Sequence, residues 1–115
     1  MADGSPQLGR LLRDAHELAI PAIVLGGSRD GIAQSRHRRR YEEWLRALVA
    51  TCRVLRVDEG TATDYATIRS ELKRAGRPIP ANDTWIAALA RQHAMPVISR
   101  DEHFDFVPKL TRIAW

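Results

Sequence analysis

The sequence predicts an α/β domain with a mainly parallel central sheet flanked by helices. The first observation behind this prediction is that helical patterns alternate along the chain with short β-rich runs, which is typical of parallel sheets. The second is the length. A chain of 115 residues suffices for a single hydrophobic core, so we expect one domain over residues 1–115, with residues 1–6 disordered.

The first half of the chain contains two predicted strands. The expected elements are a helix over 7–17, a strand over 18–23, an ambiguous segment over 24–34, a helix over 36–51 and a strand over 53–57. Pro21 suggests the end or an edge of the first strand, and glycines weaken any helix in the ambiguous segment. The apolar face of the second helix is predicted from Tyr41, Trp44, Leu45, Leu48 and Val49. The second strand alternates with period two.

The second half repeats the alternation of helix and strand. The expected elements are a helix from Asp58 or Thr61 to about Ala75, a helix over 82–94, a strand over 96–99, a loop over 101–108 and a strand over 111–115. Gly76 stops the first of these helices. Asn82 is the predicted N-cap of the second. Its inward side is predicted to consist of Trp85, Ile86, Leu89 and Ala90.

Composition excludes some functional classes and favours others. The net charge of +4 and the isoelectric point near 10 fit a polyanionic partner, either nucleic acid or an acidic protein. A single cysteine, Cys52, allows neither an internal disulfide nor a cysteine zinc cluster. No apolar run reaches membrane-spanning length, and the first residues lack the pattern of a signal peptide. We therefore expect a cytoplasmic protein that does not contact a membrane.

Two aspartates are the main candidates for chemistry. Asp83 opens a helix and Asp101 follows the next strand, so a parallel sheet would bring both to the crevice outside the strand ends. Two carboxylates there suit Mg²⁺ or Mn²⁺ and phosphodiester chemistry. Each acid also has an ordinary explanation, because an acid in a first helical turn complements the helix dipole and an acid after a strand is common in turns.

Other polar residues are weaker candidates. Ser99 adds a hydroxyl beside Asp101, and Asp105 is a possible third acid or a solvated loop residue. Arg100 and His103 are candidate contacts to a phosphate. The basic run over 36–40 is more simply a solvated helix start than a phosphate-binding surface, because no aromatic residues interleave with it.

At these positions the chain resembles the PIN-domain family, and within it the VapC-like toxins of type II toxin–antitoxin systems. The resemblance rests on P-I-P-A-N-D-T-W-I-A-A-L-A and M-P-V-I-S-R-D-E-H-F and extends over residues 18–115. It implies a three-layer fold and a Mg²⁺-dependent endoribonuclease that is usually dimeric and is neutralised by a small antitoxin. It also implies that Asp83 and Asp101 are the third and fourth catalytic, metal-binding acids, with Ser99 as an accompanying hydroxyl.

The chain departs from the family pattern at the other two acids. The family's first acid ends an N-terminal apolar strand, which this sequence lacks. Its second is a glutamate where L-G-G-S-R-D-G places Gly27, and Asp30, one helical turn further on, is a partial substitute. We therefore expect reduced or lost activity. The alternatives are a non-catalytic module that binds an antitoxin or a second copy, and a gene fragment.

Overall fold

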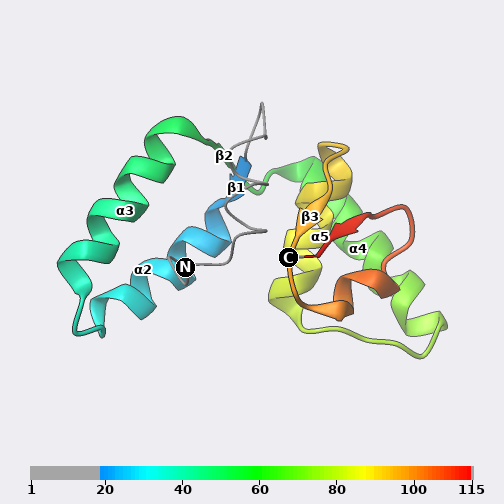
Figure 1. Cartoon of the computed structure of the whole chain (residues 1–115). Helices are drawn as coiled ribbons and strands as arrows, with labels where there is room; N and C mark the ends of the chain where they lie inside the picture. The colour runs from blue at the N-terminus through cyan, green and yellow to red at the C-terminus, as the bar shows by residue number, and fades with distance from the viewer. Residues whose placement is uncertain (1–18, 115) are drawn as a thin grey trace. The chain divides into compact units, whose positions relative to one another are not determined.

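The computed structural model describes residues 19–114 (Figure 1). The chain divides into two compact units, Met1–Arg56 and Val57–Trp115. Three predictions concern residues outside the described range and are not tested by the structure: the helix over 7–17, the disorder of residues 1–6 and the lack of a first strand. The α/β class and the parallel pairing of strands are confirmed.

The first unit is a pair of helices attached to a pair of strands. Its described elements are β1 (Ala19–Pro21), α2 (Ala22–Ala33), α3 (Arg38–Thr51) and β2 (Arg53–Leu55). Strands β1 and β2 are parallel, with Ile20 opposite Val54. Pro21 ends β1 and is the N-cap of α2, as its fixed φ allows.

The segment that the glycines left ambiguous is helical, and α2 packs against α3. Helix α3 begins at Arg38, two residues later than expected. On its predicted apolar face Leu45 is buried, and Tyr41, Trp44, Leu48 and Val49 are half-buried. The predicted inward side of this helix is therefore confirmed.

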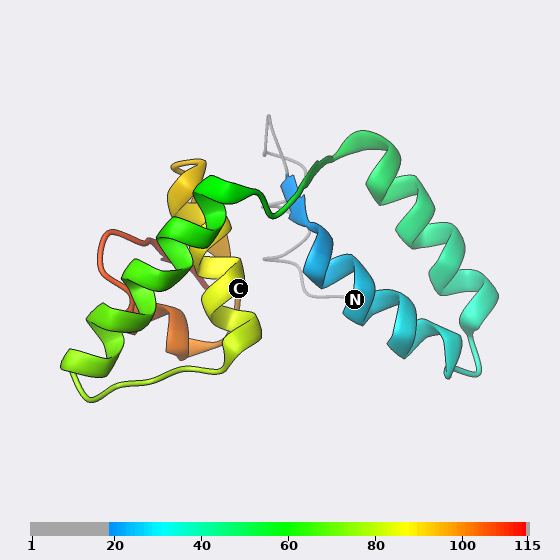
Figure 2. The same ribbon diagram turned by 180° about the vertical axis from the view of Figure 1, so that it is seen from behind.

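The second unit contains α4 (Glu59–Arg74), α5 (Ala81–Gln92), β3 (Val97–Ile98), the 3₁₀ helix η1 (Glu102–Phe106) and β4 (Arg112–Ile113). Helices α4 and α5 pack side by side, on one side of the parallel β3–β4 pair (Figures 1 and 2). The predicted loop over 101–108 thus contains a short helix. The buried core of this unit comprises Ile68, Leu72, Ala87, Ala88, Phe104 and Val107.

Both ends of α4 follow from its sequence. At the start, the Asp58 carboxylate accepts the Thr61 backbone N–H at 3.0 Å and the Thr61 hydroxyl accepts the Asp58 N–H at 3.0 Å, which is a capping box. At the end, Gly76 adopts a positive φ of 68°, and the Arg77 N–H reaches back to the Leu72 carbonyl at 2.9 Å. This Schellman closure confirms Gly76 as the helix stop.

The start of α5 differs from the prediction. Pro80 is the N-cap and Asn82 lies exposed inside the first turn, so the prediction of Asn82 as the cap is wrong. The reason is that Pro80 has a φ of −57°, which already suits helix entry, and its carbonyl accepts both the N–H and the hydroxyl of Thr84. Further along, Leu89 and Ala90 are buried as predicted, whereas Trp85 and Ile86 are only half-buried.

No helix within residues 19–114 is long and apolar enough to cross a membrane.

The start of α4 provides a test of helix capping. Because the Asp58 carboxylate also accepts the side-chain amide of Gln92 at 2.8 Å, it links the start of α4 to the end of α5. Replacing Asp58 with alanine removes these acceptors and should lower the free energy of unfolding measured in urea titrations. Asp58→Asn keeps an acceptor oxygen and should lose clearly less. Equal losses for the two variants would contradict the capping role.

Candidate functional site

Asp83 lies in the first turn of α5, on the side of the helix next to the unit's core. Its neighbour Thr84 is buried, and the Asp83 side chain is itself only 20% exposed. The helix is held in place by the buried Ala87 and Ala88, which pack against α4. The carboxylate position is therefore set by a rigid element rather than by a loop.

Asp101 is positioned by local hydrogen bonds after β3. Its backbone N–H donates to the Ser99 hydroxyl at 3.0 Å, and its carboxylate accepts the His103 backbone N–H at 2.9 Å as the cap of η1. These turns fix the carboxylate although its side chain is 43% exposed. The hydroxyl of Ser99 thus has a defined structural role, which is to orient the residue that follows the strand end.

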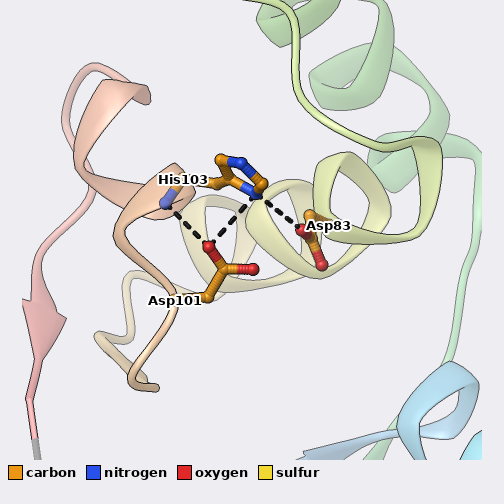
Figure 3. A group of neighbouring side chains, drawn as sticks. All are labelled: Asp83, Asp101 and His103. Atoms are coloured by element: carbon orange, nitrogen blue, oxygen red, sulfur yellow. Dashed lines mark hydrogen bonds and ion pairs between the residues drawn. The ribbon is translucent and has the colours of Figure 1, made fainter.

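The structure brings Asp83, Asp101 and His103 together (Figure 3). Nδ1 of His103 lies 3.1 Å from Oδ1 of Asp101 and 3.5 Å from Oδ2 of Asp83. One carboxylate oxygen from each aspartate and a ring nitrogen of His103 all lie within 4.8 Å of one another. The imidazole, which is 46% exposed, therefore lies against both carboxylates.

The two carboxylates influence each other's charge. Burial raises the pKa of the Asp83 carboxyl, the negative charge of Asp101 raises it further, and the hydrogen bond from His103 partly offsets both effects. Two acids this close repel when both are ionised. A positive charge between them relieves that repulsion, and this is the electrostatic property expected of a cation site.

Asp105, predicted as a supporting third acid, does not belong to this group. Its carboxylate pairs with Arg112 through two hydrogen bonds of 2.8 and 2.9 Å. That pairing lowers the pKa of Asp105 and raises the pKa of Arg112. Arg112 also donates to the Ser99 carbonyl at 3.1 Å, so it holds together both ends of the segment that carries Asp101 and His103.

Sequence reasoning missed Arg112. An arginine in a terminal strand is ordinary, and nothing in the spacing links it to Ser99 or Asp105. Covariation of positions 105 and 112 among related sequences is the signal that would indicate this pair.

The remaining candidates lie elsewhere or stay predictions. Gly27 and Asp30 both lie in α2, in the first unit; the space around Gly27 is open and Asp30 is exposed. Arg100 is exposed next to Asp101. In the basic run over 36–40, Arg38 makes an exposed ion pair of 3.8 Å with Glu42, which agrees with a solvated helix start.

The donor set of the cluster fits a divalent cation. Bonds of about 2.1 Å at right angles place neighbouring ligand atoms about 3 Å apart, close to the separation of 3.1 Å between Nδ1 of His103 and Oδ1 of Asp101. Carboxylate oxygens are preferred by Mg²⁺ and Mn²⁺, and an imidazole nitrogen adds preference for transition metals. The second unit thus contains a possible acidic metal site.

The opposite pKa shifts of Asp83 and Asp105 predict opposite pH responses in the presence of a chelator. A raised pKa means that the stability contribution of Asp83 is full below about pH 4 and is lost as pH rises through the folded-state pKa. Asp83→Asn should therefore gain melting temperature relative to the parent chain between about pH 3 and pH 7. Asp105 contributes stability above about pH 4 and loses it as pH falls.

Asp105→Asn should consequently be less stable than the parent at neutral pH, and the difference should shrink in acid. Melting curves of the three proteins across this pH range check both signs. A parallel response of the two variants would show that the electrostatic description of the cluster is wrong.

Comparison with known proteins identifies related chains. Ribonuclease VapC5 of Mycobacterium tuberculosis is 43% identical over 56 residues, which cover 49% of this chain and 42% of that protein. Toxin FitB of Neisseria gonorrhoeae is 39% identical over 80 residues, covering 70% of this chain and 54% of that protein. The chain therefore spans about half the length of these curated relatives.

A solved structure of VapBC-5 from Mycobacterium tuberculosis, a member of the VapBC family of toxin–antitoxin systems, also matches. The TM-score is 0.74 at 28% identity, over 84% of this chain and 81% of that one. The PIN domain family matches residues 4–110, which is most of the chain. The protein therefore belongs to the PIN domain family.

Proposed function

We propose that this protein is a VapC-like endoribonuclease toxin that depends on Mg²⁺ or Mn²⁺. The observation that carries the proposal is the convergence of Asp83, Asp101 and His103 in a chain of the PIN domain family. The relatives named as a ribonuclease and as a toxin support it. RNA is the substrate, in agreement with the net charge of +4, and we place the protein in the cytoplasm.

In this proposal Asp83 and Asp101 hold the metal ion, and His103 supplies a third donor atom. A divalent cation bound there neutralises phosphate charge and lowers the pKa of a coordinated water. The protein's own contribution is to fix the donors. Ser99 orients Asp101 through its backbone, while Arg112 and Asp105 hold the segment between them. Arg100 is our candidate for contacting a substrate phosphate beside Asp101.

We further propose that cleavage is slow. Magnesium binding depends on charge neutralisation by several carboxylates. At the position where the family has a glutamate, Gly27 has no side chain, and the described cluster contains only two acids. Asp30 is the nearest acid along α2. Weak metal binding would reduce activation of the attacking water without changing the fold.

Cleavage of single-stranded and structured RNA tests the proposed function. The parent chain should cleave RNA slowly with Mn²⁺ or Mg²⁺ and not with a chelator. Asp83→Asn and Asp101→Asn should each lower the rate about 100-fold or more, because each removes a charged metal ligand. Glu102→Gln is the matched control, since Glu102 is an exposed acid next to Asp101 but outside the cluster. Unchanged cleavage by both aspartate variants would refute the proposal.

Metal binding can be measured without catalysis. Mn²⁺ at 100 times its dissociation constant should stabilise the native state by about 2.7 kcal/mol, which is visible as a higher melting temperature. The increase should disappear in Asp101→Asn and persist in Glu102→Gln. In His103→Ala the response to Mn²⁺ should fall more than the response to Mg²⁺, because imidazole favours transition metals. An unaltered Mn²⁺ response in Asp101→Asn would place the ion elsewhere.

A second candidate function is a non-catalytic module that binds an antitoxin protein or a second copy of the chain. It is favoured by the likeness to VapBC-5, which is described as part of a toxin–antitoxin system. The half-buried Tyr41, Trp44 and Leu48 on α3 offer apolar surface for such a contact. An inactive chain that sediments as a stable homodimer or antitoxin complex would favour this candidate. If the chain cleaves RNA slowly and also forms these complexes, both candidate functions hold.

A further inference from the structure

An exposed phenylalanine lies next to the carboxylate cluster. Phe106 is the last residue of η1 and is 37% exposed, whereas its neighbours Phe104 and Val107 are buried at 4% and 3%. Among residues 19–114, the other exposed large hydrophobic residues are Val24 and Val57, both aliphatic. Phe104 and Val107 thus belong to the core of the second unit, whereas part of Phe106 stays at the surface.

Arg77 lies over this ring. The carbon of its guanidinium group is 4.9 Å from the ring centroid, within the range of a cation–π contact. The Arg77 backbone is fixed by the end of α4, because its N–H bonds the Leu72 carbonyl after the left-handed turn at Gly76. The fixed backbone thus places the Arg77 side chain beside Phe106, where the guanidinium contacts the ring.

The pair continues into the proposed metal site. The ring centroids of Phe106 and His103 are 6.3 Å apart, and His103 is the residue that contacts both Asp83 and Asp101. Phe106 is thus near both Arg77 and His103, and His103 connects it to the two carboxylates. We call these three residues the planar row.

We propose that Arg77 and Phe106 bind a nucleotide of single-stranded RNA next to the scissile phosphate. This inference rests on the proposed ribonuclease function. The exposed part of the Phe106 ring stacks on the base, and Arg77 adds stacking and a positive charge for the adjoining phosphate. Aromatic rings paired with arginine are the usual means of holding single strands without reading their sequence. Bases inside a duplex have both faces covered, so the site selects unpaired RNA.

The experiment measures binding of the full chain to a fluorescein-labelled single-stranded RNA in the presence of a chelator, which prevents cleavage. Phe106→Leu keeps the apolar volume and removes the aromatic face, so the Kd should rise about tenfold. Phe106→Trp keeps an aromatic face and should bind the RNA with a Kd like that of the parent chain. Arg77→Gln should weaken binding and reduce the slope of the salt dependence by about one. Val57→Ala, which alters another exposed hydrophobic residue of the same unit, is the matched control and should bind like the parent.

Stacking itself is read from RNA containing 2-aminopurine, whose fluorescence should be quenched by the parent chain and not by Phe106→Leu. Melting curves establish whether each variant is folded. If Phe106→Leu is unfolded, Phe106→Tyr replaces it in the test. Because Phe106→Tyr keeps an aromatic face, it should still quench the fluorescence. Parent-like Kd and quenching in Phe106→Leu, or an equal loss of binding to duplex RNA, would overturn the proposal.

Failure of this inference differs from failure of the proposed function. If Phe106→Leu cleaves RNA with the parent's kcat and KM while Asp83→Asn is inactive, the nuclease stands and the planar row has no part in it. If Asp83→Asn cleaves like the parent, the nuclease assignment fails whatever the RNA-binding measurements show. If Phe106→Leu binds RNA like the parent chain but binds an acidic protein more weakly, the planar row is a contact surface for a protein rather than for RNA.

Discussion

The close packing of α5 on α4 is the constraint on which the second unit depends. Ala87 and Ala88 of α5 are fully buried in one cluster with Ile68 and Leu72 of α4, and side chains this small allow neighbouring elements to pack closely. Polar contacts then fix how far the helices can slide. Arg91 on α5 pairs with Glu71 on α4 at 2.9 Å, and Gln92 bonds Asp58 at the helix start. The position of Asp83 follows from this packing, since the residue lies on the same rigid helix.

Asp101 and His103 depend on a different and smaller device. The segment from Ser99 to Asp105 has little buried surface of its own apart from Phe104. What holds its two ends is Arg112, which bonds the Ser99 carbonyl and both oxygens of Asp105. Bidentate arginine–carboxylate pairs add geometric definition as well as energy. Helix packing therefore fixes the Asp83 side of the cluster, and the contacts of Arg112 fix the Asp101 side.

The sequence predicts that Asp83 and Asp101 lie close together, and the structure shows the chain path on which that prediction depends. A helix followed by a short strand returns the chain, so that residues at the helix start and at the strand end meet at one edge. The contact of His103 with both acids was not predictable, because it requires the 3₁₀ turn after Asp101, and periodicity does not distinguish such a turn from a loop. The N-cap of α5 was predicted at Asn82 rather than Pro80, since side-chain capping preferences do not account for the conformational restriction of proline.

The capping box and the arginine contacts also bear on how quickly this unit forms. The polar links of the second unit all join residues of that unit: they are 34 positions apart for Asp58 and Gln92, 20 for Glu71 and Arg91, and 13 for Ser99 and Arg112. Closing a loop within one unit costs less entropy than closing a loop that spans the whole chain, because the entropic cost grows with loop length. The helix hairpin that carries Asp83 needs no distant segment to assemble. The contacts that position Asp83, Asp101 and His103 thus all lie within the second unit, so the framework of the site can re-form from contacts inside that unit.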